Sequence, residues 1–201
     1  MKYNFIEIGT SDFRTLIQTC DDETKGLSIE PLQYYLNRLP NKKNVTKVNY
    51  AISNKEDLID IYYVSSDNIK KFKLPMWVRG CNSINNPHPS IKKLLKEQHD
   101  NVISIQKVKC ITWGTLINEF NVSSIDFLKI DTEGHDHIIL EEYYNLCINI
   151  PSLWANKIIF EMNVLSNMEA LSSLITKFKN IGYQGIKHPD DYELIKNKKS
   201  L

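Results

Sequence analysis

Acidic and imidazole side chains crowd together at residues 131–137, directly after an apolar run. The run from Ile125 to Ile130 is long enough for one buried strand. In open α/β sheets, ligands bind at the carboxyl ends of the strands, so side chains placed there can touch a substrate. We therefore expect this stretch to carry the chemistry of the protein. A helix N-cap at Thr132, followed by acids in the first helical turn, is the structural alternative.

Several of these residues suit acid–base catalysis. His135 belongs to the residue type whose ordinary pKa lies near neutrality, which suits a general base. Asp131 and Glu133 are further candidates, although Glu133 also suits a helix cap. Glu161 follows the strand expected at residues 157–160, which puts another carboxylate at the same sheet edge as Asp131. We expect Asp131 to be essential, and the base is either His135 or a carboxylate.

The carboxylates of Asp131, Glu133 and Glu161 also make a divalent cation site a hypothesis. Oxygen ligands suit magnesium, manganese or calcium, and a bound cation lowers the pKa of a coordinated hydroxyl. A salt bridge to a lysine is the alternative for Glu161, because lysines are frequent in the chain. Magnesium or manganese is therefore a candidate cofactor.

A glycine turn follows the strand expected at residues 3–9. Gly9, Thr10 and Ser11 lead into a helical stretch, and a glycine here lets the backbone approach a ligand closely while helix amides point at it. The dinucleotide fingerprint needs two more glycines, but Ser11 and Arg14 occupy those positions. The turn thus argues against a nicotinamide cofactor.

Glu30 ends the second expected strand, about twenty residues after the glycine turn. An acid at this place can accept hydrogen bonds from both ribose hydroxyls of a nucleoside cofactor. A surface carboxylate before a helix that begins at Pro31 is the alternative. After the third strand, Ala51, Ile52 and Ser53 fall where an adenine ring would lie.

The segment from Ser65 to Ser90 lacks periodicity, and three prolines interrupt it. A loop of this length inside a compact domain is usually functional or disordered, and we favour a substrate lid inserted at residues 65–90. Trp77 beside Arg79 can stack on and hydrogen-bond a sugar ring, although a loop tryptophan more often plugs a core edge. His88, between two prolines, can face the site or serve as a turn residue.

Strands and helices alternate through most of the chain, which is typical of an α/β fold with a doubly wound parallel sheet. Strands are expected at residues 3–9, 26–29, 45–52, 58–64, 102–110, 125–130 and 157–160. Helices are expected at residues 13–20, 32–39, 91–98, 115–120, 132–145 and 168–180. Residues 182–186 and 192–195 form a closing hairpin, and residues 196–201 a polar tail.

Composition narrows the class of protein. The 201 residues suit a single domain, and the net charge of +1 gives no electrostatic footprint for nucleic acid. No apolar run approaches the length of a membrane span, and no N-terminal segment resembles a signal peptide. Reduced thiols in a cytoplasmic protein are the simplest interpretation of four widely spaced cysteines, Cys20, Cys81, Cys110 and Cys147.

Together these motifs resemble the FkbM family of methyltransferases. The most specific part is residues 128–136, which match that family's pattern of lysine, apolar residue, aspartate, any residue, glutamate and glycine. The resemblance implies a Rossmann-like sheet of the class I methyltransferase type, mostly parallel with an antiparallel closing strand. It also implies binding of S-adenosylmethionine and methyl transfer to a hydroxyl, often on a sugar or polyketide ring. The strand ends that it assigns to the cofactor include Glu7, Gly9, Thr10, Ser11, Glu30, Pro31, Ala51, Ile52 and Ser53.

Two departures from the family pattern keep other functions open. Asp12 and Phe13 stand where a second glycine often occurs, so a degenerate cofactor-binding module without activity is one alternative. The family's N-terminal covering segment is absent, so the domain is expected to come from a longer protein with other catalytic domains. RNA ribose 2'-O-methylation is the other alternative, but the helix expected at 132–145 carries no lysine of the kind those enzymes use. We therefore expect O-methylation of a sugar, glycan or similar small acceptor.

Overall fold

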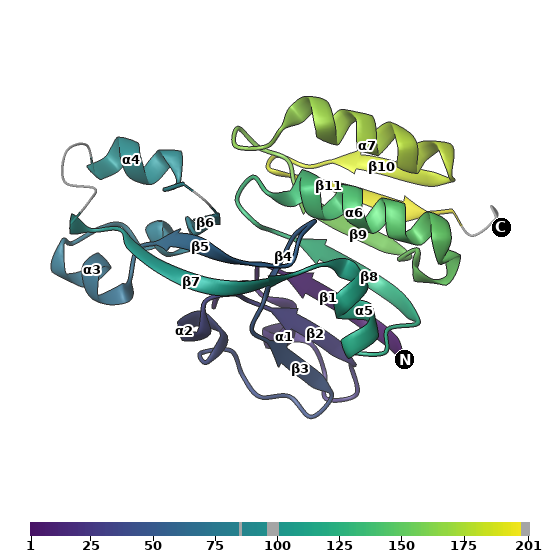
Figure 1. Cartoon of the computed structure of the whole chain (residues 1–201), viewed down its shortest axis with the longest axis horizontal. Coiled ribbons are helices and arrows are strands. Elements are labelled where there is room, and N and C mark those ends of the chain that lie inside the picture. The colour runs from purple at the N-terminus through teal and green to yellow at the C-terminus, as the bar shows by residue number, and fades with distance from the viewer. Residues whose placement is uncertain (85, 96–100, 198–201) are drawn as a thin grey trace.

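A seven-stranded sheet forms the centre of the protein (Figure 1). The structure is a computed structural model that describes residues 1–84, 86–95 and 101–197. In spatial order the strands are β10 (Tyr183–Lys187), β11 (Asp191–Lys196), β9 (Lys157–Glu161), β8 (Ser124–Ile130), β1 (Lys2–Ile8), β2 (Gly26–Ile29) and β3 (Val45–Val48). Strands β9, β8, β1, β2 and β3 run parallel, and β11 is antiparallel to β9. The predicted fold class, with its antiparallel closing strand, is confirmed.

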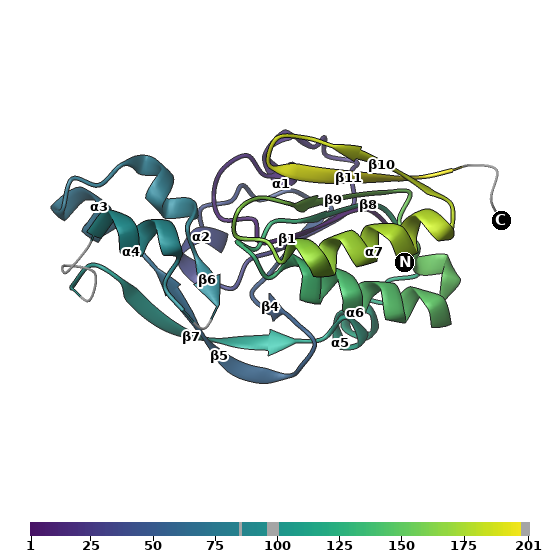
Figure 2. The same ribbon diagram turned by 90° about the horizontal axis from the view of Figure 1, so that it is seen from above.

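Helices cover both faces of this sheet (Figure 2). Ile6 and Ile8 of β1 point into the larger core, together with apolar residues of α5 (Trp113–Glu119), α6 (Asp136–Asn149) and α7 (Met168–Asn180). Phe5 points the other way and packs against α1 (Leu16–Thr19) and α2 (Gln33–Leu36). Because successive strand residues face opposite sides, burial of both sets needs a helix layer on each face.

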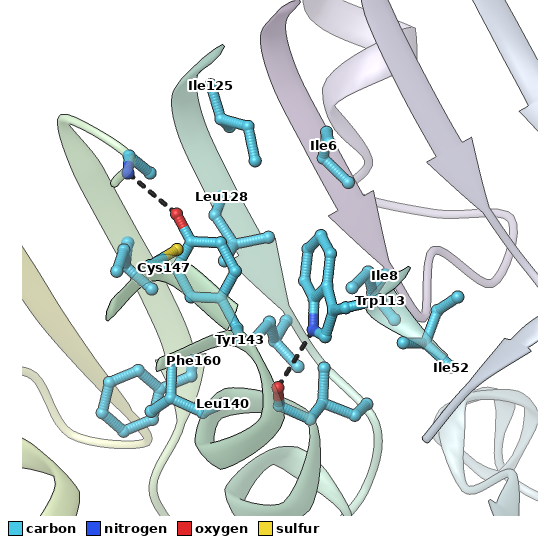
Figure 3. Packing of buried hydrophobic residues seen from close by; sticks show 14 of the residues in the cluster. Ile6, Ile8, Ile52, Trp113, Ile125, Leu128, Leu140, Tyr143, Cys147 and Phe160 are labelled. Atoms are coloured by element: carbon cyan, nitrogen blue, oxygen red, sulfur yellow. Dashed lines mark hydrogen bonds between the residues drawn. The ribbon is translucent and has the colours of Figure 1, made fainter. Parts of the chain in front are cut away.

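Aromatic residues with satisfied polar atoms fix the larger core (Figure 3). Trp113 is fully buried, and its Nε1 donates to the carbonyl of Ile139 at 3.0 Å. The hydroxyl of Tyr143 donates to the carbonyl of Leu153, in the turn η3 (Pro151–Leu153), and accepts from the amide of Ala155. Buried aromatic residues of this kind need such partners. These bonds hold α6 against the sheet whose strand ends carry the site.

A second, four-stranded sheet was not foreseen. Its order is β4 (Ala51–Ile52), β7 (Ser104–Ile111), β5 (Asp57–Tyr63) and β6 (Ser83–Ile84). The expected single strand at 45–52 is therefore wrong, because the chain leaves the main sheet after Val48 and re-pairs Ala51 with Cys110 of β7. The strand expected at 102–110 belongs to this second sheet, where it pairs antiparallel with β5.

The described part of the segment at 65–90 is folded, so the expectation of an irregular loop is wrong. It holds α3 (Ser66–Lys71), the 3-10 turn η1 (Met76–Gly80) and β6, and α4 (Pro89–Leu95) follows. Ser65 caps α3 by accepting from the amide of Asn68, and Ile69, Val78 and Ile91 share a small apolar core. These elements form a lobe beside the main sheet (Figures 1 and 2).

Helix limits differ from expectation at several ends. The helices α1 and α2 are one-turn elements, shorter than the ranges 13–20 and 32–39, and α6 begins at Asp136 instead of 132. The end of the helix expected at 91–98 and the tail at 198–201 lie outside the described residues. Among the helices that the structure describes, none is long and apolar enough to cross a membrane.

Candidate active site

A cavity of about 340 Å³ lies at the carboxyl ends of the central parallel strands. Its lining comes from both sheets and includes most residues expected to bind a cofactor or to act on a substrate. From the cofactor set, the lining residues are Gly9, Thr10, Ser11, Glu30, Pro31, Ala51 and Ile52; from the catalytic set, they are Asp131, Glu133 and Glu161. Glu7, Ser53, Trp77, Arg79, His88 and His135 are not among the lining residues.

Gly9 allows the two halves of the site to approach each other. Its φ of +81° is one that residues with a side chain rarely adopt. A Cβ atom added to Gly9 would lie 1.9 Å from the carbonyl oxygen of Asp131. The glycine turn therefore packs directly on the end of β8. Ser11 also has a positive φ, of 49°, so this turn stores backbone strain beside the cavity.

Glu30 lies in the cavity wall with both carboxylate oxygens already bonded. Oε2 accepts from the amide of Ser11 at 2.7 Å, and Oε1 accepts from the amide of Leu32 at 2.9 Å. The side chain is almost fully buried, and burial raises the pKa of Glu30 to about 7 against the effect of these bonds. Glu30 thus orders the glycine turn and lines the cavity.

Next to Glu30, the wall is apolar. Pro31, Ala51 and Ile52 line it as predicted positions, and Tyr50 and Ile61 join them. Sequence patterns did not single out Tyr50 or Ile61. Ile61 belongs to β5 of the second sheet, which was not foreseen. An apolar wall beside a carboxylate suits a purine ring next to its ribose.

Glu7 acts behind the cavity wall. It is fully buried; one oxygen accepts from the amide of Leu16 at 2.8 Å, and the other pairs with Lys129 Nζ at 2.9 Å. Lys129 Nζ also lies 3.7 Å from Asp131 Oδ2. Burial raises the pKa of Glu7, and Lys129 opposes that shift. Through Lys129, Glu7 is connected to the acidic end of the cavity.

Three carboxylates converge at the acidic end of the cavity. One oxygen each from Asp131, Glu133 and Glu161 lies within 4.8 Å of the others. Burial raises the pKa of Asp131 to about 7 and that of Glu161 to about 9, and nearby carboxylates add to both shifts. Glu161 Oε1 accepts from the side-chain amide of Asn163 at 2.6 Å, whereas Oε2 is buried without a partner among the described residues.

Sequence patterns missed three further acids at this end. Asp190, which precedes β11, and Asp191, which begins it, both line the cavity. Asp136 is buried; its Oδ2 accepts from the amide and hydroxyl of Thr132, and its Oδ1 accepts from the amide of Glu161. Asp136 thereby joins the ends of β8 and β9. For Asp190 and Asp191, the sequence signal for a site was two adjacent acids between the strands of the closing hairpin.

His135 does not line the cavity that holds the acid cluster. Its Nε2 lies 2.9 Å from the hydroxyl of Ser53, and the residue is the N-cap of α6. Burial lowers the pKa of His135 to about 4, with a smaller effect from His137. Because its ring lies outside the cavity lining and its pKa is lowered, His135 is a poorer candidate base than Asp131.

The expected acceptor contacts lie on the lobe at 65–95. Trp77 is half exposed. The guanidinium carbon of Arg79 lies 4.3 Å from the ring centroid of Phe13, and a guanidinium nitrogen lies 3.7 Å from Asp12 Oδ1. These contacts fasten η1 to the glycine turn, so Arg79 holds the cavity wall from outside. His88 reaches Glu133, with 3.0 Å between its Nε2 and Oε2 of the acid.

Comparison with protein-family models matches residues 4–184 to the methyltransferase FkbM domain. The match includes every strand end that lines the cavity except Asp190 and Asp191. No curated protein and no solved structure gives a significant match.

Proposed function

Because the chain belongs to the FkbM methyltransferase family, we propose that it transfers the methyl group of S-adenosylmethionine to a hydroxyl of a sugar, glycan or similar small acceptor. Methyltransferases of this kind generally use that donor. The observation that carries the proposal is one cavity that is lined both by Glu30 with apolar residues and by the cluster of Asp131, Glu133 and Glu161. The first group suits the nucleoside of the donor, and the second suits an alcohol.

In the proposed reaction, the acceptor oxygen attacks the methyl carbon in line with the sulfonium sulfur, and S-adenosylhomocysteine leaves. Holding the three reacting atoms in a row can supply about 7–11 kcal/mol of the barrier. The hydroxyl proton goes to a base, which adds about 10²–10⁴ in rate. Asp131 is our choice of base for the cavity without a cation, because its pKa of about 7 lets it accept a proton near neutral pH.

Magnesium or manganese at Asp131, Glu133 and Glu161 is a further part of the proposal. The clustered oxygens are of the type that hard cations prefer, and the buried Oε2 of Glu161 has no hydrogen-bond partner among the described residues. When bound, the cation would lower the pKa of the acceptor hydroxyl. Calorimetry with manganese on the wild type and on Glu161→Gln tests this site. Equal heats of binding from both proteins would refute the cation site.

The charge of the cavity argues against an RNA acceptor. Two basic residues, Arg14 and Lys129, line the cavity. The six acids that line it are Glu30, Asp131, Glu133, Glu161, Asp190 and Asp191. A phosphate backbone requires the opposite balance.

Two measurements test the proposed function. Calorimetry with S-adenosylmethionine measures donor binding, and incubation with methyl-labelled donor and a panel of sugars and glycans measures transfer. Donor binding followed by a labelled ether on an acceptor is the expected result. Tight binding without transfer to any hydroxylated acceptor would favour the inactive module, and absence of binding would refute the enzyme.

A further inference from the structure

His88 links the lobe at 65–95 to the acidic end of the cavity. It lies just before α4, and its ring is 4% exposed. Its Nε2 lies 3.0 Å from Glu133 Oε2, across 45 residues of sequence. Glu133 lines the cavity, whereas His88 does not. The ring therefore touches a lining carboxylate from behind.

The second ring nitrogen fixes the direction of this hydrogen bond. The backbone amide of Ser90 donates to His88 Nδ1 at 3.1 Å. A nitrogen that accepts a hydrogen bond carries no proton, so the ring proton must be on Nε2. His88 therefore donates its Nε2–H to the carboxylate of Glu133. Buried between Ser90 and Glu133, the imidazole has both of its polar atoms satisfied.

The backbone at Glu133 is strained, and its carboxylate depends on the lobe for a hydrogen bond. Its φ is +53°, and that of Gly134 is +95°, so two successive residues lie in the left-handed region. A Cβ on Gly134 would lie 2.9 Å from the carbonyl of Leu165, which makes this turn tight. Among the residues that the structure describes, His88 is the sole hydrogen-bond donor to the Glu133 carboxylate.

We propose that His88 is a positioning residue for methyl transfer, which holds the Glu133 carboxylate at the angle that meets the acceptor hydroxyl. The inference rests on the proposed function, because it assigns a task within the same cavity. It replaces the direct acceptor contact expected of His88 with an indirect one. It also gives the lobe a task in the reaction, since the donor to Glu133 comes from that lobe and not from the main sheet.

Substitutions that differ in hydrogen-bonding capacity test the proposal. In His88→Gln, the side-chain amide can still donate to Glu133, whereas His88→Leu removes the donor. We expect kcat with the identified acceptor to fall about 10- to 100-fold in the leucine variant and to recover most of that loss in the glutamine variant. Donor affinity should stay within about twofold in both, because the cofactor end is untouched.

A second histidine provides the matched control. His188 makes the same kind of pair, 2.9 Å from Glu193 Oε2, but it is exposed and does not line the cavity. His188→Leu should leave kcat unchanged. A leucine variant at position 88 with the wild-type kcat would overturn the proposal, and so would a glutamine variant that falls as far as the leucine variant.

Nitrogen-15 NMR of the histidine rings tests the geometry without turnover. For His88 in the wild-type protein we expect a protonated Nε2 and an unprotonated Nδ1, and in Glu133→Gln faster exchange of the Nε2 proton. A ring protonated on Nδ1 would overturn the inference even if His88→Leu fails to fold. Absence of donor binding or methyl transfer in the wild type would instead refute the proposed function, so the two failures are distinguishable.

Discussion

Replacing Glu30 tests the proposed cofactor site. The buried Glu30 carboxylate bonds two backbone amides and, in our proposal, also binds the ribose hydroxyls of the donor. Its oxygens accept from the amides of Ser11 and Leu32 at 2.7 and 2.9 Å. A carboxylate offers about four acceptor positions, so two remain for the ribose hydroxyls of the donor. Glu30→Ala removes both sets of bonds together, and each set is measured in a different experiment.

The expected loss of donor affinity follows from two charge-assisted hydrogen bonds. At about 1.5 kcal/mol each, their loss weakens binding by about 3 kcal/mol, which is roughly 100-fold in Kd. Folding also suffers, because two buried amides lose their acceptor at about 1–3 kcal/mol each. Removing a carboxylate that burial penalises offsets part of that cost. We expect the free energy of unfolding to fall by about 1–3 kcal/mol.

Calorimetry with S-adenosylmethionine measures the first loss, and urea denaturation measures the second. Glu23→Ala is the matched control, since Glu23 is exposed and is not among the residues that line the cavity. It should change neither quantity. A folded Glu30→Ala variant with the wild-type donor affinity would refute the ribose assignment. An unchanged free energy of unfolding would refute the structural role of the two amide bonds.

Three further predictions concern the strand ends and the acid cluster. Asp131→Asn should lower kcat by about 10²–10⁴ without loss of folding, and a fully active variant would remove Asp131 as the base. Gly9→Ala should destabilise the fold by about 2–5 kcal/mol in urea denaturation, because the methyl group meets the Asp131 carbonyl at 1.9 Å on a left-handed backbone; a wild-type midpoint would contradict this. Stability should also fall as pH rises from 6.5 to 9. Burial raises the folded-state pKa of Asp131 and Glu30 to about 7 and of Glu161 to about 9, so the folded state binds more protons than the unfolded chain in this range. His135, whose pKa is lowered to about 4, opposes this trend only below pH 6.5, and a urea midpoint that rises with pH would contradict the prediction.

Sequence by itself determined the main sheet, because its signals are local. Apolar runs at 125–130 and 157–160 and the acids that end them could be read directly, since a buried strand needs a continuous apolar run and a ligand edge needs polar side chains. The pattern at 128–136 and the pair Glu30-Pro31 were likewise enough to indicate the family, which the match over residues 4–184 confirms.

Only the tertiary structure decided which distant segments meet. Strand β5 pairs with β7 across more than forty residues, and periodicity reports that a strand is present but not where its partner lies. For the same reason, the place of Asp190 and Asp191 in the cavity lining, and the contact of His88 with Glu133, could not be predicted from their neighbours in sequence. His135 shows the converse. It lies within the most informative stretch, yet its ring bonds Ser53 and does not line the cavity that holds the neighbouring acids.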